Sequence, residues 1–298
     1  MGYVIIDEQH RFGVKQRLEL LSKAEAADLL LMTATPIPRS LNLVLYGDMD
    51  VSYLRTKPKN NLPIITRIVS DNKIDELALS LRNIIDKGQQ IYWICPLIQE
   101  SEHKNFTNVT FRYEFLKSIY GDFAGLVHGG MTQDEKDGAM NDFKNGITKL
   151  LVATTVIEVG IDVPNATLIV IEDSQAFGLS QLHQLRGRVG RSNLQSYCML
   201  VYKSKSLSEV GKARLNIIKS SNDGFEISEQ DLSLRGAGDI VGLRQSGRNS
   251  FVFSNLVNHS DLLELAKEFI ESNPSLIPSQ EVIKLFDKEH ISDEWIIA

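Results

Sequence analysis

Short apolar runs that alternate with amphipathic stretches of helical length constrain this chain more than any other feature of its sequence. From residue 57 to residue 205 the runs of strand length are Ile64–Val69, Gln90–Ile98, Gly125–His128, Lys149–Ala153, Leu168–Glu172 and Tyr197–Tyr202. The intervening stretches with helical spacing are Asn72–Lys87, Thr110–Tyr120, Asp134–Lys144 and Ser180–Arg186. Such alternation is typical of parallel α/β units. We therefore expect an α/β fold with a parallel sheet.

The regions on either side of this α/β region read differently. Before it, strand-like runs at Tyr3–Ile6 and Leu29–Met32 flank a helical stretch at Val14–Ala27, which is only a fragment of a sheet. The polar stretch from Lys57 to Pro63 contains two prolines and is a linker candidate. Beyond residue 206 the pattern is mainly helical, at Leu207–Ser220, Ser228–Arg235, Ser260–Ser272 and Ser279–Phe286. We expect three regions: 1–56, 57–205 and 206–298.

Three local signals complete the expected fold. Thr132 and Glu135 have the spacing of a capping box at the start of a helix. The polar segment Glu102–Asn108 is expected to be a loop. Cys95 and Cys198 each lie in an apolar run, which predicts two buried thiols rather than a disulfide or a zinc site.

A carboxylate pair follows the first apolar run. Residues 4 to 13 read Val-Ile-Ile-Asp-Glu-Gln-His-Arg-Phe-Gly, so Asp7 and Glu8 stand where a strand ends. Asp7 suits the outer shell of a Mg²⁺ ion, and Glu8 suits the polarisation of an attacking water molecule. Gln9 and His10 complete a box of the kind found in nucleotide-hydrolysing motors. The box alone also arises by chance, and the phosphate loop Gly-x-x-x-x-Gly-Lys-Ser/Thr occurs nowhere in the 298 residues.

Two threonine-containing segments also stand at strand ends. Thr33 and Thr35 follow the second apolar run, where their hydroxyls are placed to bond to the carboxylate box, although threonines there are often only turn formers. Thr154 and Thr155 open the segment Thr154–Ala166, in which hydroxyls and exposed amides suit a nucleic-acid backbone. Gly160 and Asp162, later in this segment, suit the nucleotide side of a cleft.

The most specific segment is Gln181–Arg191, which reads Gln-Leu-His-Gln-Leu-Arg-Gly-Arg-Val-Gly-Arg. Its three arginines are separated by Gly187 and Gly190, each of which costs a helix interior roughly 1 kcal/mol. A solvated basic helix is therefore a poor interpretation. The pattern favours arginine side chains that project into a cleft and bind phosphate through their guanidinium forks.

Charge and hydropathy bear on partners and location. The formal net charge is −6, but residues 181–247 carry ten Lys/Arg against six Asp/Glu, whereas residues 248–298 carry four against nine. A basic middle and an acidic tail fit a polyanion-binding surface on part of the molecule, although a bias of this size is also compatible with ordinary solvated charge. The sequence contains no signal peptide pattern and no run of the roughly 18 apolar residues that a membrane span needs, so we expect a cytoplasmic protein with no membrane partner.

Together these segments resemble the motifs of the superfamily 2 helicases. The segments that resemble helicase motifs II to VI are, in order, Asp7–Gly13, Thr33–Arg39, Tyr92–Ile98, Thr154–Ala166 and Gln181–Arg191. The segment from Ser221 to Gly247 resembles an element shared by bacterial RecG and the transcription-repair translocase Mfd, and its wording Ser-Asn-Asp-Gly-Phe favours RecG. The sequence is thus similar to the C-terminal motor portion of the RecG family.

The resemblance implies a fold and a set of roles. Residues 1–56 would be the remnant of one RecA-like lobe, 57–205 a second, complete RecA-like lobe, and 206–298 a mainly helical segment with the translocation element and an acidic tail. ATP and Mg²⁺ would lie between the lobes. Gln184, Arg188 and Arg191 would reach the phosphates, Gly160 and Asp162 would line the nucleotide cleft, and Arg235 and Arg244 would be polar contacts of the translocation element.

The implied function is ATP hydrolysis coupled to movement along duplex DNA, on branched DNA in bacterial recombination and repair. Contacts to DNA are expected to be mostly with phosphates. The resemblance does not extend to the family's phosphate loop or its N-terminal wedge domain, so we expect little ATP turnover from these 298 residues alone. Three interpretations stay open: a motor part completed by a separate chain that carries the phosphate loop and the wedge, a non-catalytic remnant of a split or decaying gene, and an Mfd-like translocase.

Overall fold

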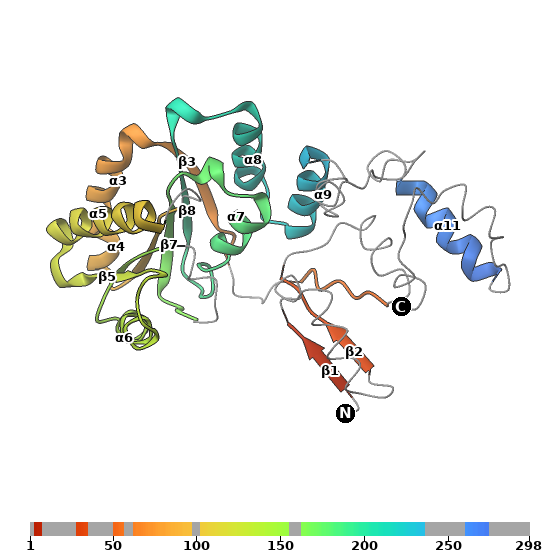
Figure 1. Cartoon of the computed structure of the whole chain (residues 1–298), viewed down its shortest axis with the longest axis horizontal. Helices are drawn as coiled ribbons and strands as arrows, with labels where there is room; N and C mark the ends of the chain where they lie inside the picture. The colour runs from red at the N-terminus through yellow and green to blue at the C-terminus, as the bar shows by residue number, and fades with distance from the viewer. Residues whose placement is uncertain are drawn as a thin grey trace. The chain divides into compact units, whose positions relative to one another are not determined.

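The computed structural model describes residues 3–7, 28–34, 50–56, 62–96, 102–154, 162–235 and 260–273 (Figure 1). Of residues 102–108, 235, 260, 261, 263 and 264 it describes the backbone only. The chain divides into two compact units, one made of Met1–Pro36 with Leu54–Asp231 and the other of Ile37–Tyr53 with Leu232–Ala298. The three regions expected from the sequence remain a prediction.

A six-stranded parallel sheet forms the centre of the first unit. Its strands are β3 (Ile65–Ser70), β4 (Gln90–Ile94), β5 (Ala124–Val127), β6 (Leu150–Ala153), β7 (Ala166–Ile171) and β8 (Tyr197–Tyr202). They lie in the order β3-β8-β7-β4-β6-β5, and every neighbouring pair is parallel. The expectation of a parallel α/β fold is confirmed, with all six strands at the predicted places.

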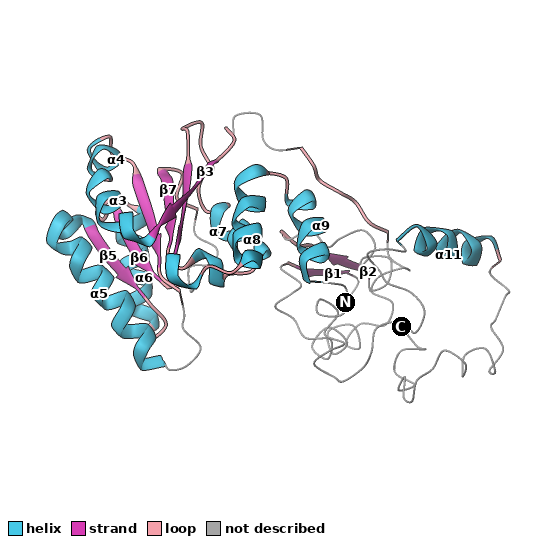
Figure 2. Ribbon diagram, turned by 90° about the horizontal axis from the view of Figure 1, so that it is seen from above, coloured by secondary structure: helices cyan, strands magenta, loops and turns pink. Residues whose placement is uncertain are grey.

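Burial on both faces explains why the central strands are almost uniformly apolar. All residues of β4, β6 and β7 are buried, as expected for parallel strands covered by helices on each side. One face packs against α3 (Ile74–Ser80), α4 (Arg82–Asp86) and α5 (Glu102–Tyr120), through a core that includes Trp93, Val152 and Val170 from the strands. Figure 2 shows these helices beside the sheet.

The alternate residues of the same strands face a second layer of helices. Tyr92 of β4 packs against Phe143 of α6 (Gln133–Lys144), with ring centroids 4.9 Å apart. The other helices that follow in the chain are α7 (Leu179–Arg186) and α8 (Glu209–Ser220), which bury Leu182, Leu185, Leu215 and Ile218. Helices therefore cover both faces, and they lie in the connections from β3 to β4, β4 to β5, β5 to β6 and β7 to β8.

Local sequence signals account for one helix start and fail at another. α6 begins with the predicted capping box, in which the Thr132 hydroxyl accepts from the Glu135 amide and the Glu135 carboxylate accepts from the Thr132 amide. The prediction of a loop at 102–108 is wrong, because α5 begins at Glu102. Polar residues such as Glu and Lys are good helix formers, so the polarity of this segment did not mark irregular backbone.

A separate two-stranded sheet belongs to the N-terminal region. β1 (Tyr3–Ile6) and β2 (Asp28–Leu31) are parallel, with Ile6 opposite Leu31, and the pairing continues as the Met32 amide donates to the Ile6 carbonyl at 2.8 Å. Both strands stand where the sequence predicts them. The helix expected at 14–27 lies outside the described residues.

Helices complete the described chain. α9 is Gly224–Arg235 and α11 is Ser260–Ser272, and the helix expected at 279–286 lies outside the described residues. Among the helices described, none combines the length and the hydropathy required to cross a membrane.

Candidate functional site

The two edges of the larger sheet carry different segments. Because its strands are parallel, they all end at one edge, the carboxyl edge, and all begin at the opposite, amino edge. Thr154 directly follows β6 and so lies at the carboxyl edge, whereas Asp162 precedes β7 by four residues and lies toward the amino edge. The predicted segment 154–166 therefore runs from one edge to the other.

The arginine-rich segment leaves a helix and turns at the amino edge. α7 carries Gln184 and ends at Arg186, and the Gly187 amide caps it by donating to the His183 carbonyl. Gly190 has a φ of +79°, and a Cβ there would lie 2.9 Å from Cγ1 of Ile64, next to the start of β3. Glycine is needed at this position for both reasons. The prediction that the segment does not continue as a helix is confirmed.

Two predicted site residues meet at this edge. The guanidinium of Arg191 forms an ion pair with the Asp162 carboxylate at 3.2 Å, and Nε of Arg191 donates to the Gly187 carbonyl at 3.3 Å. The Arg191 and Asp162 side chains are 36% and 62% exposed. An ion pair that water reaches contributes little to stability, so its arginine exchanges partners at low cost.

Tyr92 connects these groups to the sheet. Burial raises the pKa of Tyr92 to about 12, while the positive charges of Arg188 and Arg191 act to lower that pKa and the charge of Asp162 acts to raise it. The Tyr92 ring is therefore within electrostatic range of all three side chains. The sequence did not single out Tyr92 by itself, although a tyrosine within an otherwise apolar buried strand is the signal that marks it.

The arrangement suits an anion with several oxygens. Arg188 and Arg191 each supply a guanidinium group, and both follow the end of α7 directly. Guanidinium forks bind phosphate oxygens in pairs, through shorter and stronger hydrogen bonds than neutral donors make. Gln184 lies half-buried in the last turn of α7, on the same segment.

The third arginine of the segment does not behave as the sequence predicts. We expected the arginines to project into a cleft, but Arg186 is only 2% exposed and donates to main-chain carbonyls of Ile218 and Ser221. Position 186 falls on the face of α7 that carries the buried Leu182 and Leu185. Helical spacing over residues 182–186 is the signal that separates Arg186 from Arg188 and Arg191.

The N-terminal residues of the predicted site occupy neighbouring strand ends. Asp7 follows β1 and Thr33 follows β2 by two residues, and the two strands are paired in parallel. Adjacent strands lie about 4.8 Å apart, which places Asp7 and Thr33 at neighbouring strand ends. Glu8, Gln9, His10, Thr35, Thr155, Gly160 and Arg244 lie outside the described residues, as does the side chain of Arg235, the last residue of α9.

Thr154 is buried too deeply in this structure to contact nucleic acid directly. It is 1% exposed, its amide donates to the Val127 carbonyl at 3.3 Å, and its hydroxyl has no hydrogen-bond partner among the described residues. A buried hydroxyl without a partner is unusual and costs free energy. In this arrangement the Thr154 hydroxyl would have to become more exposed before it could contact a ligand at the carboxyl edge.

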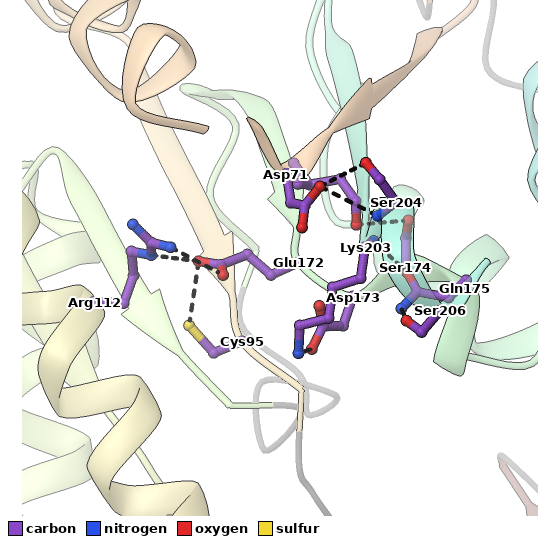
Figure 3. Close-up of polar contacts among 11 residues, drawn as sticks. Asp71, Cys95, Arg112, Glu172, Asp173, Ser174, Gln175, Lys203, Ser204 and Ser206 are labelled. Carbon is purple, nitrogen blue, oxygen red and sulfur yellow. Dashed lines mark hydrogen bonds and ion pairs between the residues drawn. The ribbon is translucent and has the colours of Figure 1, made fainter. Parts of the chain in front are cut away.

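A half-buried ion pair stands at the same edge (Figure 3). Glu172, directly after β7, accepts from Nε of Arg112 at 2.6 Å, from a second Arg112 nitrogen at 3.2 Å, and from the indole nitrogen of Trp93 at 2.5 Å. The Cys95 thiol lies 3.9 Å from the same carboxylate, and burial raises its pKa well above the usual value. These contacts tie α5 to the ends of β4 and β7.

A second polar group ties the other strands together (Figure 3). The Asp71 carboxylate accepts from the Ser204 hydroxyl at 2.8 Å and from its amide at 3.2 Å, and hydrogen bonds from Ser204 lower the pKa of Asp71. Lys203 pairs with Asp173 at 2.5 Å. The ends of β3, β7 and β8 are thereby linked at the carboxyl edge.

The cysteines match the sequence prediction. Cys95 and Cys198 are both free and buried, and burial raises the pKa of Cys198 to about 12. Neither is placed to act as a nucleophile, because a thiolate is disfavoured in both surroundings.

Two families match parts of the sequence. The helicase conserved C-terminal domain matches residues 73–193. ATP-dependent DNA helicase RecG, domain 3, C-terminal matches residues 221–283. The first match covers strands β4 to β7 of the larger sheet, with their helices and the arginine segment, and the second begins just after α8.

Curated proteins similar to this chain are named ATP-dependent DNA helicase RecG. That of Staphylococcus aureus (strain NCTC 8325) is 48% identical over 270 residues, which is 90% of this chain and 39% of that protein. That of Staphylococcus epidermidis (strain ATCC 12228) is 47% identical over the same shares. The chain thus spans about 39% of the length of these relatives.

Solved structures agree with the sequence matches. RecG bound to a three-way DNA junction is 41% identical, with a TM-score of 0.67, and the similarity covers 88% of this chain and 33% of that chain. Dbp5 of S. cerevisiae, bound to RNA and ADP BeF3, is 16% identical with a TM-score of 0.55 over 79% of this chain and 63% of its own, and shows the shared helicase fold alone. With a helicase C-terminal domain followed by the RecG-specific domain, at 48% identity over 90% of its length, the chain belongs to the RecG family and represents the C-terminal portion of such a protein.

Proposed function

We propose that this chain is the C-terminal motor part of an ATP-dependent DNA helicase or translocase that acts on branched DNA in recombination and repair. The observation that carries the proposal is the exposed ion pair of Arg191 with Asp162 at the amino edge of a RecA-like lobe, in the turn that also carries Arg188. In a chain of the RecG family, two such arginines have the chemistry required to bind and neutralise the phosphates of a nucleotide.

The arginine segment would act by exchange of partners. Mg²⁺-bound ATP supplies the phosphoanhydride bond whose hydrolysis releases the free energy for movement. Arg191 would leave the exposed Asp162 carboxylate and bind phosphate oxygens, and Arg188 would add a second guanidinium. Because the Asp162 pair is weak, this exchange costs little, whereas the gain in charge neutralisation is large where phosphoryl charge is spread.

The N-terminal strand would supply the metal contact. Mg²⁺ at phosphate-transfer sites keeps several water ligands and needs only one or two carboxylates in addition to phosphate oxygens. Asp7 at the end of β1 meets that requirement, with Glu8 proposed to orient the attacking water. No cluster of three or more metal-ligating side chains occurs in the described part of the chain, and a site of this kind does not require one.

DNA would bind at the carboxyl edge and along the translocation element. Thr154 and Thr155 are proposed to contact the sugar-phosphate backbone, and Arg235 and Arg244 to contact DNA as it moves. One solved relative is RecG bound to a three-way DNA junction, which supports branched DNA as the ligand. Affinity that rests on phosphate contacts should fall steeply with salt concentration.

The phosphate loop is proposed to come from sequence beyond the 39% of the relatives that this chain spans, on the same polypeptide or on a separate chain. A role on chromosomal DNA would place the protein in the bacterial cytoplasm.

A chimaera tests the proposal. In it, this chain replaces the matched 270 residues of the Staphylococcus aureus relative, which supplies the remainder of the motor. We expect ATP hydrolysis that is stimulated by three-way junction DNA, and little hydrolysis by the 298-residue chain alone. Glu8→Gln should abolish the hydrolysis, while Arg82→Ala, on an exposed helix surface, serves as the matched control.

Two outcomes would contradict the proposal. A chimaera that folds and binds DNA without hydrolysing ATP would identify the chain as a non-catalytic relative of the motor. Strong hydrolysis by the 298-residue chain that Glu8→Gln abolishes would show that these residues contain a complete nucleotide site.

A further inference from the structure

Arg186 is the arginine that the proposed nucleotide site leaves unused. Its guanidinium is 2% exposed and makes three polar contacts: to the Ile218 carbonyl at 2.6 Å, to the Ser221 carbonyl at 2.8 Å and to Nδ1 of His183 at 3.1 Å. None of the carboxylates in the described ranges pairs with it. Burial lowers the pKa of Arg186, which shows that its charge is held at a cost.

The carbonyls that Arg186 binds lie at the end of α8, just before the start of α9. Ile218 is in the last turn of α8, whose carbonyl end favours a positive charge, and Ser221 is the first residue after that helix. A buried cation that is matched by carbonyls and an imidazole nitrogen, with no carboxylate among the described residues, costs more desolvation free energy than an apolar side chain of similar size would.

From Ser221 the contacts continue into α9. The Ser221 hydroxyl donates to the Glu226 carboxylate at 2.5 Å and accepts from the Asp223 amide at 3.1 Å, and the Asp223 carboxylate accepts from the Phe225 amide at 2.8 Å. The Ile227 amide donates to the Asp223 carbonyl at 3.1 Å. The position of Ser221 therefore sets the start of α9, and the RecG-specific domain begins at this same residue.

On its other side, Arg186 is joined to the phosphate-binding arginines. The Arg188 amide donates to the Leu185 carbonyl at 3.0 Å and the Val189 amide donates to the Arg186 carbonyl at 3.3 Å. A shift of Arg188 therefore moves the turn that holds Arg186.

We propose that Arg186 is a positioning residue that joins the arginine segment 187–191 to the segment 221–227, so that the two move as one unit. The role of this unit depends on the proposed function. When Arg188 and Arg191 move at the nucleotide, the guanidinium of Arg186 would displace α9 and the translocation element with them. The joined unit itself exists without nucleotide or DNA.

Hydrogen exchange in the full 298-residue chain tests the joined unit. The reporters are hydrogen-bonded amides: Gly187, Arg188 and Val189 on one side, and Ser221, Asp223, Phe225 and Ile227 on the other. Arg186→Met should raise the exchange rates of both groups by about tenfold or more, the scale expected for lost charged hydrogen bonds. Arg186→Lys, which keeps the charge but not the fork, should restore part of the protection. Arg82→Ala, on the exposed surface of α4, should leave both groups unchanged.

A second variant tests transmission without touching Arg186. Glu226→Ala removes the acceptor of the Ser221 hydroxyl, and it should accelerate exchange at Gly187, Arg188 and Val189 as well as at 221–227. In an Arg186→Met background the same change should add nothing at 187–189, which is the signature of coupling through one residue. If Arg186→Met does not fold, Glu226→Ala and Arg186→Lys still decide the question.

The proposal is overturned if Glu226→Ala affects only 221–227, or if Arg186→Met leaves exchange at 221–227 unchanged. Neither outcome depends on catalysis. An inactive chimaera would count against the proposed function and leave the exchange result standing.

Discussion

The two edges of the six-stranded sheet hold their charges in different ways. At the amino edge, Arg191 and Asp162 form an ion pair that water reaches, with Arg188 nearby. At the carboxyl edge, Arg112 and Glu172 form a two-bond pair in which both side chains are about 15% exposed. Arg191 can exchange the Asp162 carboxylate for another ligand at low cost, whereas the Arg112–Glu172 pair holds α5 against the end of β7. An arginine–carboxylate pair thus suits ligand exchange at one edge and stabilises the fold at the other.

Removal of an amino-edge arginine should have the largest effect on activity. In the chimaera, Arg188→Ala should lower kcat by about 10³-fold, because arginine fingers contribute factors of that order. DNA affinity, measured by fluorescence anisotropy with junction DNA, should change by less than about threefold. Loss of DNA binding with normal kcat would contradict the role given to Arg188.

Removal of the carboxyl-edge arginine should mainly affect stability. Arg112→Met leaves the Glu172 carboxylate half-buried without its partner and should lower the free energy of unfolding by about 3 kcal/mol. Urea denaturation followed by Trp93 fluorescence measures the change, since the indole nitrogen bonds to Glu172. The double variant with Glu172→Leu should recover part of the loss. A decrease in the free energy of unfolding of less than about 1 kcal/mol would mean that the Arg112–Glu172 pair does not stabilise the fold.

Thr154 allows stability and binding to be separated at the carboxyl edge. Thr154→Val replaces a buried hydroxyl that has no partner in the described part of the chain, so the free energy of unfolding should rise by about 1 kcal/mol. If the hydroxyl serves DNA, affinity for DNA should fall severalfold in the same variant. Unchanged affinity would remove Thr154 from the proposed DNA contacts.

An exposed pair on the surface of α4 sets the baseline. Arg82 and Asp86 lie one turn apart on α4, with side chains 59% and 58% exposed. Arg82→Ala should change the free energy of unfolding by less than about 0.5 kcal/mol and leave ATP hydrolysis unchanged. A larger effect would show that exposure is a poor guide to the role of an ion pair in this protein.

The strands and the helix ends were predictable because their signals are local. The apolar runs gave six strands in the right places, and the glycines at 187 and 190 marked the end of α7. The start of α5 was not predictable from polarity, because the polar residues from Glu102 onward occur in helices as well as in loops.

The site was predictable in its composition but not in its internal contacts. Asp162 and Arg191 were assigned to one cleft from their motifs, and the fold pairs them. The burial of Arg186 depends on α8, a helix that lies about 30 residues further along the chain, and the influence of Tyr92 depends on strand order. Pairings of this kind arise from tertiary packing, which no local pattern encodes.

α7 also connects the two edges of the sheet over a fixed length. It starts after Gly178, on the carboxyl side of the sheet, and ends beside the arginines on the amino side, and eight helical residues make it about 12 Å long. A helix resists compression, so the two edges keep a constant spacing whatever binds at either of them. A ligand at one edge of this lobe would therefore affect a ligand at the other edge by tilting or shifting α7, and not by changing its length.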